Sequence, residues 1–570
     1  MGRNHFSVFM VVVLAGLCAC GTLGATTRRG GSAQVQRLSV EDYLDKMKGG
    51  WIGQMAGVGW GAPTEFKFNG MIIPEDKVPQ WEPRLINQFN QDDIYVEMTF
   101  LRTLELYGFD VSIRRAGLDF ANSGYPLWHA NRAGRDNLRA GIAPPDSGHP
   151  KYNKCADDID YQIEADFSGL IAPGMPNVVI QLGEIFGRLM NYGDGLYGGQ
   201  FVGGMYAAAF FESNMVKIVE AGLQCIPRES QYHECISDVL RWYRQYPQDW
   251  VKTWQLINEK YHLNPQYRRF SCTGAASAFN IDAKINGAYI VMGLLYGRGD
   301  PDQTVVISMR CGQDSDCNPS NAAGILFTTI GFEKLPDKFT SALDLSRKFS
   351  HTPYDFPTLL RVSEKLTRDA VVNCGGKMVT DQGGKEYFVI PRQTPRPTAL
   401  ERCWDAKPAL ECRYTPEEMA QITAESGKDL SKAIGEFAPG WKVSKCGEAE
   451  NPGLRKELRG RENVLVTHPL GQNVGCVLSR SVDLPASRKS TLKLVVGHDA
   501  RGDWDLIVKA NGEVLLRKTI GPETTTLGWV EVNVDLSRFA GRTVNLELVN
   551  EPTGWRYETG HWAQIVIVSE

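Results

Sequence analysis

The chain has 570 residues, of which 42% are hydrophobic and 22% charged, and its formal net charge is −4. This composition is typical of a globular protein, and the length is sufficient for two or three domains. The acidic balance excludes a broad basic surface of the kind that binds phosphate backbones. We therefore expect no nucleic-acid partner.

Residues 1–25 have the pattern of a signal peptide, with Arg3 followed by an apolar run from Phe6 to Leu17 and then small residues. The run is too short to span a bilayer as a helix of the mature protein. The stretch around Cys20 also resembles a bacterial lipoprotein signal, in which that cysteine is lipidated; simple secretion, with cleavage near Ala25, is the alternative. Both predict an exported protein in the periplasm or at the cell surface. A lipid on Cys20, which only the lipoprotein signal implies, would be its only attachment to a membrane.

Eleven cysteines follow this segment. In an oxidising compartment they would allow up to five disulfides and leave one thiol. No CxxC or HExxH pattern accompanies them, so the sequence does not predict a zinc site.

Hydrophobic periodicity predicts an all-α bundle over about residues 38–370. Ser39 and Asp42 have the spacing of a helix N-terminus. A second helix is expected to begin at Asp92 and to end at Gly108. Apolar segments that mix small and large residues indicate buried helices at 289–296 and 322–330.

The pattern changes after about residue 375, where glycines and prolines predict a connecting region. Towards the C-terminus the hydrophobic period becomes two, and Asn511-Gly512 predicts a β-hairpin. We therefore expect a multidomain protein in which an all-β, jelly-roll-like sandwich follows the bundle. The predicted parts are a catalytic domain at 38–405, a linker at 406–460 and the sandwich at 461–570.

A set of aromatic residues lies near the turns of this sandwich: Trp504, Trp529, Trp555, Tyr557 and Trp562. They form part of its core, or they stack on sugar rings, in which case the domain would resemble the carbohydrate-binding modules of secreted glycosidases.

Two acidic pairs are the strongest candidates for chemistry. Asp92 and Asp93 stand at the start of a predicted helix, where an isolated pair would only complement the helix dipole. Asp314 and Asp316 lie in a polar loop before another helix. If the two helix starts converge, four carboxylates would repel one another unless a cation lies between them. Hard oxygen ligands favour Mg²⁺, Mn²⁺ or Ca²⁺ over zinc.

Three blocks extend this argument: the glycine-rich run from Gly50 to Glu65, the triplet Gln91-Asp92-Asp93, and the stretch from Asp314 to Asn318. In this order they resemble the ADP-ribosylglycohydrolase family over about residues 38–405. The resemblance implies an all-α fold with a two-metal centre, usually of magnesium or manganese, that hydrolyses a glycosidic bond. For this chain we expect one or two divalent cations, Mg²⁺ before Mn²⁺ or Ca²⁺.

The resemblance also implies roles for single residues. Glu65 and Asp314 are the expected catalytic residues, Glu65 as a base or as a ligand that approaches the metals. The family usually has threonine where this chain has Gln91 and Cys317. An amide oxygen can replace a hydroxyl ligand, whereas a thiol matches Mg²⁺ poorly. The expected metal ligands are Gln91, Asp92, Asp93, Asp314, Asp316 and Cys317.

Further polar residues are candidates for contact with the substrate. Asp158 and Asp166 lie beside an apolar helical stripe and either face the substrate or belong to the surface; a solvated helix face explains Asp157, Asp160 and Glu164. In the glycine-rich stretch 193–204, substrate contact and close helix packing are equal alternatives. The predicted substrate-binding residues are Asp158, Asp166, Tyr197 and Gln200.

The leading hypothesis is an exported, metal-dependent hydrolase that cleaves a glycosidic bond in a carbohydrate or glycan. The first alternative is an enzyme that removes ADP-ribose from a protein or small molecule. The second is a surface glycan-binding protein whose metal site is structural only. The sequence does not indicate the oligomeric state.

Overall fold

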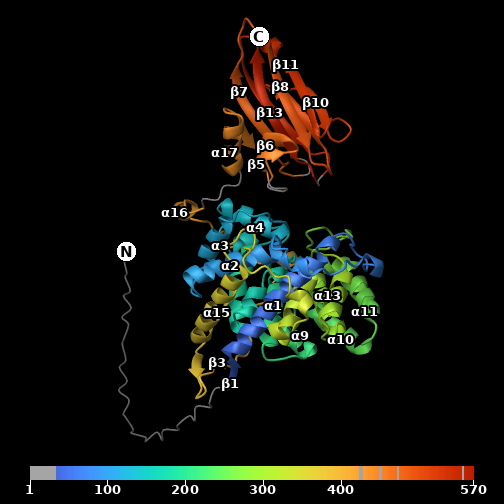
Figure 1. Ribbon diagram of the computed structural model, residues 1–570, viewed down its shortest axis with the longest axis vertical. Helices are drawn as coiled ribbons and strands as arrows, with labels where there is room; N and C mark the ends of the chain where they lie inside the picture. The colour runs from blue at the N-terminus through green and yellow to red at the C-terminus, as the bar shows by residue number, and fades with distance from the viewer. Residues whose placement is uncertain (1–33, 423–427, 448–451, 472–473, 555–556) are drawn as a thin grey trace, which may run out of the picture.

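The computed structural model describes residues 34–422, 428–447, 452–471, 474–554 and 557–570. The predicted signal segment and Trp555 lie outside these ranges. A helical domain is followed by an all-β domain, which confirms the predicted multidomain fold (Figure 1). No helix among the described residues is long and apolar enough to cross a membrane.

The helical domain packs its helices around one continuous hydrophobic core. The predicted helix starts are confirmed, because the Ser39 side chain accepts a hydrogen bond from the Asp42 N–H and the second helix begins at Asp92. The helices are α1 (Val40–Gly61), α2 (Asp92–Tyr107), α3 (Ile113–Ala121), α4 (His129–Arg139), α5 (Asp160–Ile163), α6 (Asp166–Leu170), α7 (Pro176–Phe186), α8 (Asp194–Ala209), α9 (Met215–Leu223), α10 (Gln231–Gln245), α11 (Trp250–Ile257), α12 (Ala283–Tyr296), α13 (Pro301–Arg310), α14 (Cys317–Ile330) and α15 (Phe356–Asn373).

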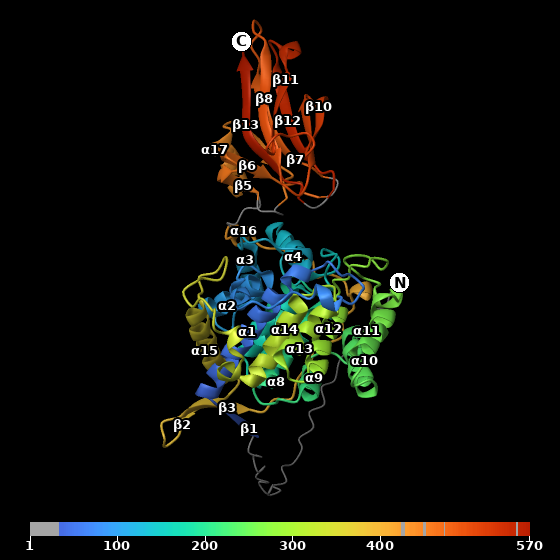
Figure 2. The ribbon, with the colours of Figure 1, turned by 45° about the vertical axis from the view of Figure 1, so that its right-hand side comes forward.

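Helices α1 and α14 lie antiparallel with their backbones in close contact, near the middle of the helical domain (Figure 2). A glycine recurs at every fourth residue of α1, so the four glycines share one face of the helix. A Cβ atom built on any of them would lie 2.2–2.4 Å from a backbone oxygen of α14 or of the residues just before it. Only glycine permits this approach, which brings the end of α1 beside the start of α14. The pairs are Gly49 with Phe327, Gly53 with Ala323, Gly57 with Pro319 and Gly61 with Ser315.

A small antiparallel sheet, which the helical pattern did not predict, joins the two ends of this domain. Its strand order is β1 (Val35–Ser39), β3 (Glu386–Pro391) and β2 (Lys377–Thr380). Val35 pairs with Pro391 and Ser39 with Tyr387. The sheet therefore fixes the chain just before α1 to the segment that follows α15.

The β domain is a sandwich of two five-stranded antiparallel sheets with orders β10-β9-β12-β7-β4 and β11-β8-β13-β6-β5. Asn511 and Gly512, both at positive φ, form the predicted hairpin turn between β9 and β10. The strands are β4 (Lys442–Ser444), β5 (Gly453–Leu458), β6 (Arg461–Thr467), β7 (Cys476–Asp483), β8 (Ser490–His498), β9 (Trp504–Ala510), β10 (Glu513–Ile520), β11 (Trp529–Asp535), β12 (Thr543–Glu551) and β13 (Gly560–Ser569).

The segment predicted as a linker, 406–460, is divided between the two domains. Its first part packs on the helical domain, where the N–H groups of Leu410 and Cys412 donate to the Asp146 carboxylate. Helix α17 (Lys428–Phe437) contributes Ile434 to the sandwich core, and β4 and β5 belong to the sheets. The short α16 (Pro416–Met419) lies between these parts. Glycines and prolines interrupt the sequence pattern here, although the contacts named above attach described parts of the segment to one domain or the other.

Three of the five aromatic residues considered for sugar stacking are core residues. Trp504 and Trp562 are fully buried, with ring centroids 5.3 Å apart, and Trp529 is 7% exposed. Tyr557 is partly buried and lies under the Arg501 guanidinium. The described residues therefore favour the core interpretation for this set.

Candidate metal centre

The first acidic pair lies in the first turn of α2. Gln91 is the N-cap residue, and Asp92 and Asp93 follow it as the first two helical residues. Asp93 is fully buried, whereas Asp92 and Gln91 are partly exposed. The positive end of the α2 dipole stabilises the negative charge of both carboxylates.

The second pair lies at the start of α14, where Asp316 is the N-cap residue. Asp314 and Asp316 are both buried. The close packing of α1 on α14 brings the end of α1 to this loop, and the hydroxyl oxygens of Thr64 and Ser315 lie 2.8 Å apart. Glu65, the next residue, is exposed. The glycine stripe of α1 thus places an accessible carboxylate beside two buried ones.

These segments converge into two overlapping groups of metal-ligating atoms. One atom each from Asp93, Asp316 and Cys317 lie within 4.8 Å of one another, and so do one atom each from Glu65, Asp314 and Asp316. Asp316 belongs to both groups. The structure therefore brings together residues that are more than 200 positions apart in the sequence.

Burial and mutual repulsion raise the pKa values of these carboxyl groups. Burial, followed by the charge of Asp316, raises the pKa of Asp92 to about 6. Burial and neighbouring carboxylates raise the pKa values of Asp93 and Asp314 well above their ordinary range. A cluster of this kind stays ionised at neutral pH when a cation offsets the repulsion.

The donor set fits a divalent metal. Asp93 Oδ1 and Asp314 Oδ1 are buried and have no hydrogen-bond partner in the structure. Unpartnered buried carboxylate oxygens are costly unless a cation or a proton satisfies them. Carboxylate oxygens are ligands for Mg²⁺, Mn²⁺ and Ca²⁺. The residues present therefore suit the kind of ion that the sequence predicted.

Two of the predicted ligands, Gln91 and Asp92, lie outside both groups. Gln91 Nε2 donates to Gln88 Oε1 at 3.4 Å. With Arg84 and Arg347 it lines a cleft of about 510 Å³. The roles of Gln91 and Asp92 as metal ligands stay predictions.

Buried hydrogen bonds fix the backbone behind the carboxylates. Gln54 of α1 donates from Nε2 to the Asp93 carbonyl at 3.3 Å and also to Glu97. Glu97 in turn accepts from the Phe167 N–H at 2.9 Å, which joins α2 to α6. Glu97 was not among the predicted site residues. The one feature of the sequence that could have indicated it is its position one turn after Asp93, on the same face of α2.

Asp166, a predicted substrate contact, is fully buried and belongs to this supporting layer. Its Oδ2 accepts a hydrogen bond from Asn321 of α14 at 2.8 Å, while its Oδ1 has no partner. Burial raises its pKa to about 7. A direct contact with substrate stays a prediction, whereas its contact with α14 is observed.

Asp158 lies beneath the N-terminus of α4. Its Oδ2 accepts the Ala130 N–H at 2.9 Å, and Asp160 accepts the next N–H, that of Asn131. Glu164 accepts from the Asn131 side chain. The expectation of a solvated face was wrong, since Asp157, Asp160 and Glu164 are all buried. Asn131, the partner of Asp160 and Glu164, lies about 30 residues away in the sequence, so local periodicity could not reveal these contacts.

Tyr197 and Gln200, the remaining predicted contacts, are buried in α8. The Tyr197 hydroxyl accepts the Glu401 N–H at 2.7 Å, and Gln200 Nε2 donates to the Ile180 carbonyl at 3.3 Å. Neither belongs to the two ligand groups. These contacts favour the helix-packing alternative for the glycine-rich stretch.

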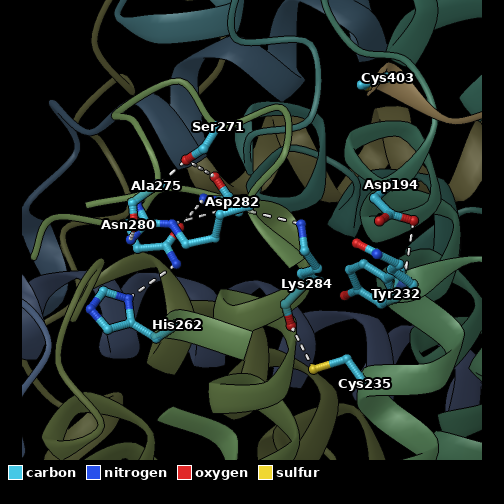
Figure 3. Close-up of polar contacts among 12 residues, drawn as sticks. Asp194, Tyr232, Cys235, His262, Ser271, Ala275, Asn280, Asp282, Lys284 and Cys403 are labelled. Atoms are coloured by element: carbon cyan, nitrogen blue, oxygen red, sulfur yellow. Dashed lines mark hydrogen bonds and ion pairs between the residues drawn. The ribbon is translucent and has the colours of Figure 1, made fainter. Parts of the chain in front are cut away.

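A buried ion-pair network holds the loop beside the centre (Figure 3). The Asp282 carboxylate lies 3.6 Å from Lys284 Nζ and 4.0 Å from Arg268 Nε, and it accepts from the Ser271 hydroxyl at 2.8 Å. Two residues before Asp282, the Asn280 N–H donates to the Gln313 side chain at 2.8 Å. The network therefore fixes the residue that precedes Asp314.

Aromatic side chains form a wall next to Glu65. The rings of Phe66 and Phe279 meet edge to face with centroids 4.8 Å apart, and the His129 ring lies 5.7 Å from Phe279. Burial lowers the pKa of His129 to about 4, so this ring is neutral at physiological pH. Trp128, at the start of α4, is 49% exposed. A flat apolar ligand face could pack here.

Comparisons with solved structures give matches of low structural similarity. Solved structures with some similarity include one described as an ADP-ribosylglycohydrolase-related protein complex, at 13% identity, covering 58% of this chain and 100% of that chain with a TM-score of 0.36. A cyclase from Fischerella sp. TAU matches at 14% identity over 23% of this chain and 74% of that chain, with a TM-score of 0.17. The adhesin domain of Lys-gingipain from Porphyromonas gingivalis W83 matches at 17% identity over 23% and 91%, with a TM-score of 0.18. TM-scores this low carry no argument about activity.

A comparison with curated proteins gives no match. The family model described as ADP-ribosylglycohydrolase matches residues 39–371, more than half of the chain. This range contains both acidic pairs, Glu65 and the α1–α14 contact. The chain belongs to the ADP-ribosylglycohydrolase family.

Proposed function

We propose that this chain is an exported hydrolase that uses a divalent-metal centre to cleave a glycosidic bond in a carbohydrate. The observation that carries the proposal is the convergence of Asp93, Asp314, Asp316 and the accessible Glu65 on one site with unpartnered carboxylate oxygens. Family membership supports hydrolysis, and families of this fold typically use divalent metals.

The site divides into buried groups that hold charge and one exposed group that can act on solvent. A bound divalent cation would orient sugar hydroxyls and stabilise negative charge on oxygen during bond cleavage. Asp93, Asp314 and Asp316, all buried, are placed to hold such a cation. Glu65 is exposed at the same point and is placed to take a proton from an attacking water.

Export is supported by a disulfide between Cys155 and Cys272. Disulfides are rare in cytosolic proteins and common in exported ones. The bond joins the segment before Asp158 to the loop that carries Ser271 and Asn280. In an exported enzyme a carbohydrate is the more accessible substrate, and the exposed Trp128 offers a surface on which a sugar ring can stack.

A second candidate is removal of an ADP-ribosyl group, the reaction of the family. The cleft lined by Arg84, Arg347 and Gln91 favours it, because guanidinium groups bind phosphate oxygens in paired hydrogen bonds. A phosphorylated substrate whose sugar lies at the carboxylates would extend its phosphates towards this cleft.

The test is turnover of the purified full chain on a glycan panel and on ADP-ribosyl substrates, with Mg²⁺ or Mn²⁺ and with chelator. We expect hydrolysis of a glycan that chelator and Asp314→Asn both abolish. Asp110→Asn, at an exposed position away from the site, is the matched control and should retain activity. Hydrolysis confined to ADP-ribosyl substrates would select the second candidate. Activity that survives both chelator and Asp314→Asn would refute the metal centre.

A further inference from the structure

Cys317 places a sulfur atom inside the carboxylate cluster. It is the first residue of α14 and is 3% exposed. Its Sγ lies 3.2 Å from Asp93 Oδ2 and 3.8 Å from Asp316 Oδ1. The thiol is not part of a disulfide. Both of these neighbours are candidate metal ligands.

The two ligand groups consequently differ in chemistry. The group of Glu65, Asp314 and Asp316 offers only oxygen, whereas the group of Asp93, Asp316 and Cys317 offers two oxygens and one sulfur. Oxygen-only sets suit Mg²⁺, Ca²⁺ and Mn²⁺, and a thiolate favours softer first-row transition metals. Asp316 is common to both groups and can bridge them.

The spacing of the sulfur and oxygen atoms fits a shared ion. Metal–sulfur and metal–oxygen bonds of about 2.3 and 2.1 Å, meeting at about 90–110°, separate the two ligand atoms by about 3.1–3.6 Å. The observed Sγ–Oδ2 distance of 3.2 Å lies in this range. The other oxygen of Asp93, Oδ1, is buried without a partner. The fold therefore places the Asp93 carboxylate, which has one oxygen without a hydrogen-bond partner, beside the Cys317 thiol, where both can bind the same ion.

We infer that the metal position formed by Asp93, Asp316 and Cys317 selects a thiophilic divalent transition metal, such as Fe²⁺, Co²⁺ or Zn²⁺, over Mg²⁺. The inference rests on the proposed function only in assuming that the carboxylates bind metal. It differs from the expectation of Mg²⁺, Mn²⁺ or Ca²⁺ at this centre.

The experiment uses the full chain, stripped of metal by chelation and titrated with Co²⁺ under argon. Thiolate coordination to Co²⁺ gives a near-ultraviolet sulfur-to-metal charge-transfer band. We expect one equivalent of Co²⁺ to produce this band in the wild type and in Cys311→Ser, and to produce none in Cys317→Thr. Cys311 is the matched control because it is a buried free thiol outside the cluster.

Competition between Co²⁺ and Mg²⁺, followed by calorimetry, gives a second readout. We expect Cys317→Thr to lower the preference for Co²⁺ by at least about tenfold, the smaller end of the effect of losing a supporting metal contact. Threonine has nearly the volume of cysteine and is the residue usual in the family, so this variant should fold; an unchanged circular dichroism spectrum verifies that.

The outcomes separate the inference from the proposed function. Stoichiometric Co²⁺ binding without the band, or an unchanged preference in Cys317→Thr, would overturn the inference and leave a metal-dependent hydrolase. Failure of wild-type protein to bind any divalent metal would overturn both. The inference would be supported by a charge-transfer band at one equivalent of Co²⁺ in the wild type, together with a lower preference for Co²⁺ over Mg²⁺ in Cys317→Thr.

Discussion

The helical domain and the sandwich bury different kinds of side chain. The helical domain encloses many carboxylates, such as Asp93, Glu97 and Asp166, several with unpartnered oxygens. Among the described residues of the sandwich Glu558 is the one buried carboxylate, and the core includes the tryptophans Trp504 and Trp562. Burying charge costs stability, while burying apolar surface contributes it. The contrast indicates that the interior of the helical domain serves a functional site at the cost of stability. The interior of the sandwich mainly stabilises its fold.

The largest expected effect is a loss of function confined to the helical domain. Because Asp316 belongs to both ligand groups, Asp316→Asn should weaken both metal positions and lower turnover by about 10³-fold or more, the scale of several kcal/mol of charge stabilisation. The measurement is kcat with metal content determined in parallel. Asp483→Asn, an exposed carboxylate of the sandwich, should change neither; if it does, function is not confined to one domain.

The next effect is a loss of stability confined to the sandwich. Trp504 is fully buried, and its Nε1 donates to the Gly497 carbonyl at 2.9 Å. Trp504→Ala should lower the free energy of unfolding of the sandwich by about 3–5 kcal/mol, since it leaves a cavity and an unpaired carbonyl. Denaturant unfolding with and without metal identifies the sandwich as the metal-insensitive transition. Trp128→Ala, at an exposed site of the helical domain, should cost less than about 0.5 kcal/mol.

The sandwich should also lose stability in acid. Burial lowers the pKa of His561, in β13, to about 4. Between this value and the ordinary pKa near 6.5 the unfolded chain binds a proton that the folded sandwich does not, so stability is present above about 6.5 and is lost as pH falls towards 4. His561→Gln should reduce that loss, which is at most about 3.5 kcal/mol at about 1.4 kcal/mol per pKa unit. Unfolding of the metal-insensitive transition at pH 7 and pH 5 tests this; an equal loss in the variant would contradict it.

The sequence predicted features that depend on neighbouring residues. The Ser39 cap, the start of α2 at Asp92 and the Asn511-Gly512 hairpin each follow from residues a few positions apart. The acidic pairs were found because their types and order are unusual. Their convergence depends on the backbone contact of α1 with α14. The glycine spacing of α1 indicates that some helix packs closely there, but it does not identify α14 as that helix.

What the sequence did not reveal depends on long-range contacts. Asp160 was expected on a solvated face because the amide that it binds lies 29 positions away, at the start of α4. The sheet of β1, β3 and β2 pairs segments about 350 residues apart, and its short strands carry little periodicity of their own. Buried charge and distant strand pairing are tertiary properties, so local pattern is a poor guide to both.

The smallest effects compare one substitution in the two domains. In Gly53→Ala the new Cβ would lie 2.4 Å from the Ala323 carbonyl oxygen, so α1 and α14 must separate. We expect a loss of about 1–3 kcal/mol in the metal-sensitive transition and weaker metal binding, because the same contact places Glu65 beside Asp314. Gly435, in α17 of the sandwich, has nothing within 4 Å of its Cβ position. Gly435→Ala should therefore gain about 0.5–1 kcal/mol, the ordinary helix preference for alanine. A loss of stability in Gly53→Ala beside a gain in Gly435→Ala would show that the glycines of α1 allow the two helices to approach, and that this approach forms the metal centre. A gain of stability in both variants would mean that the α1–α14 contact adapts and does not fix the site.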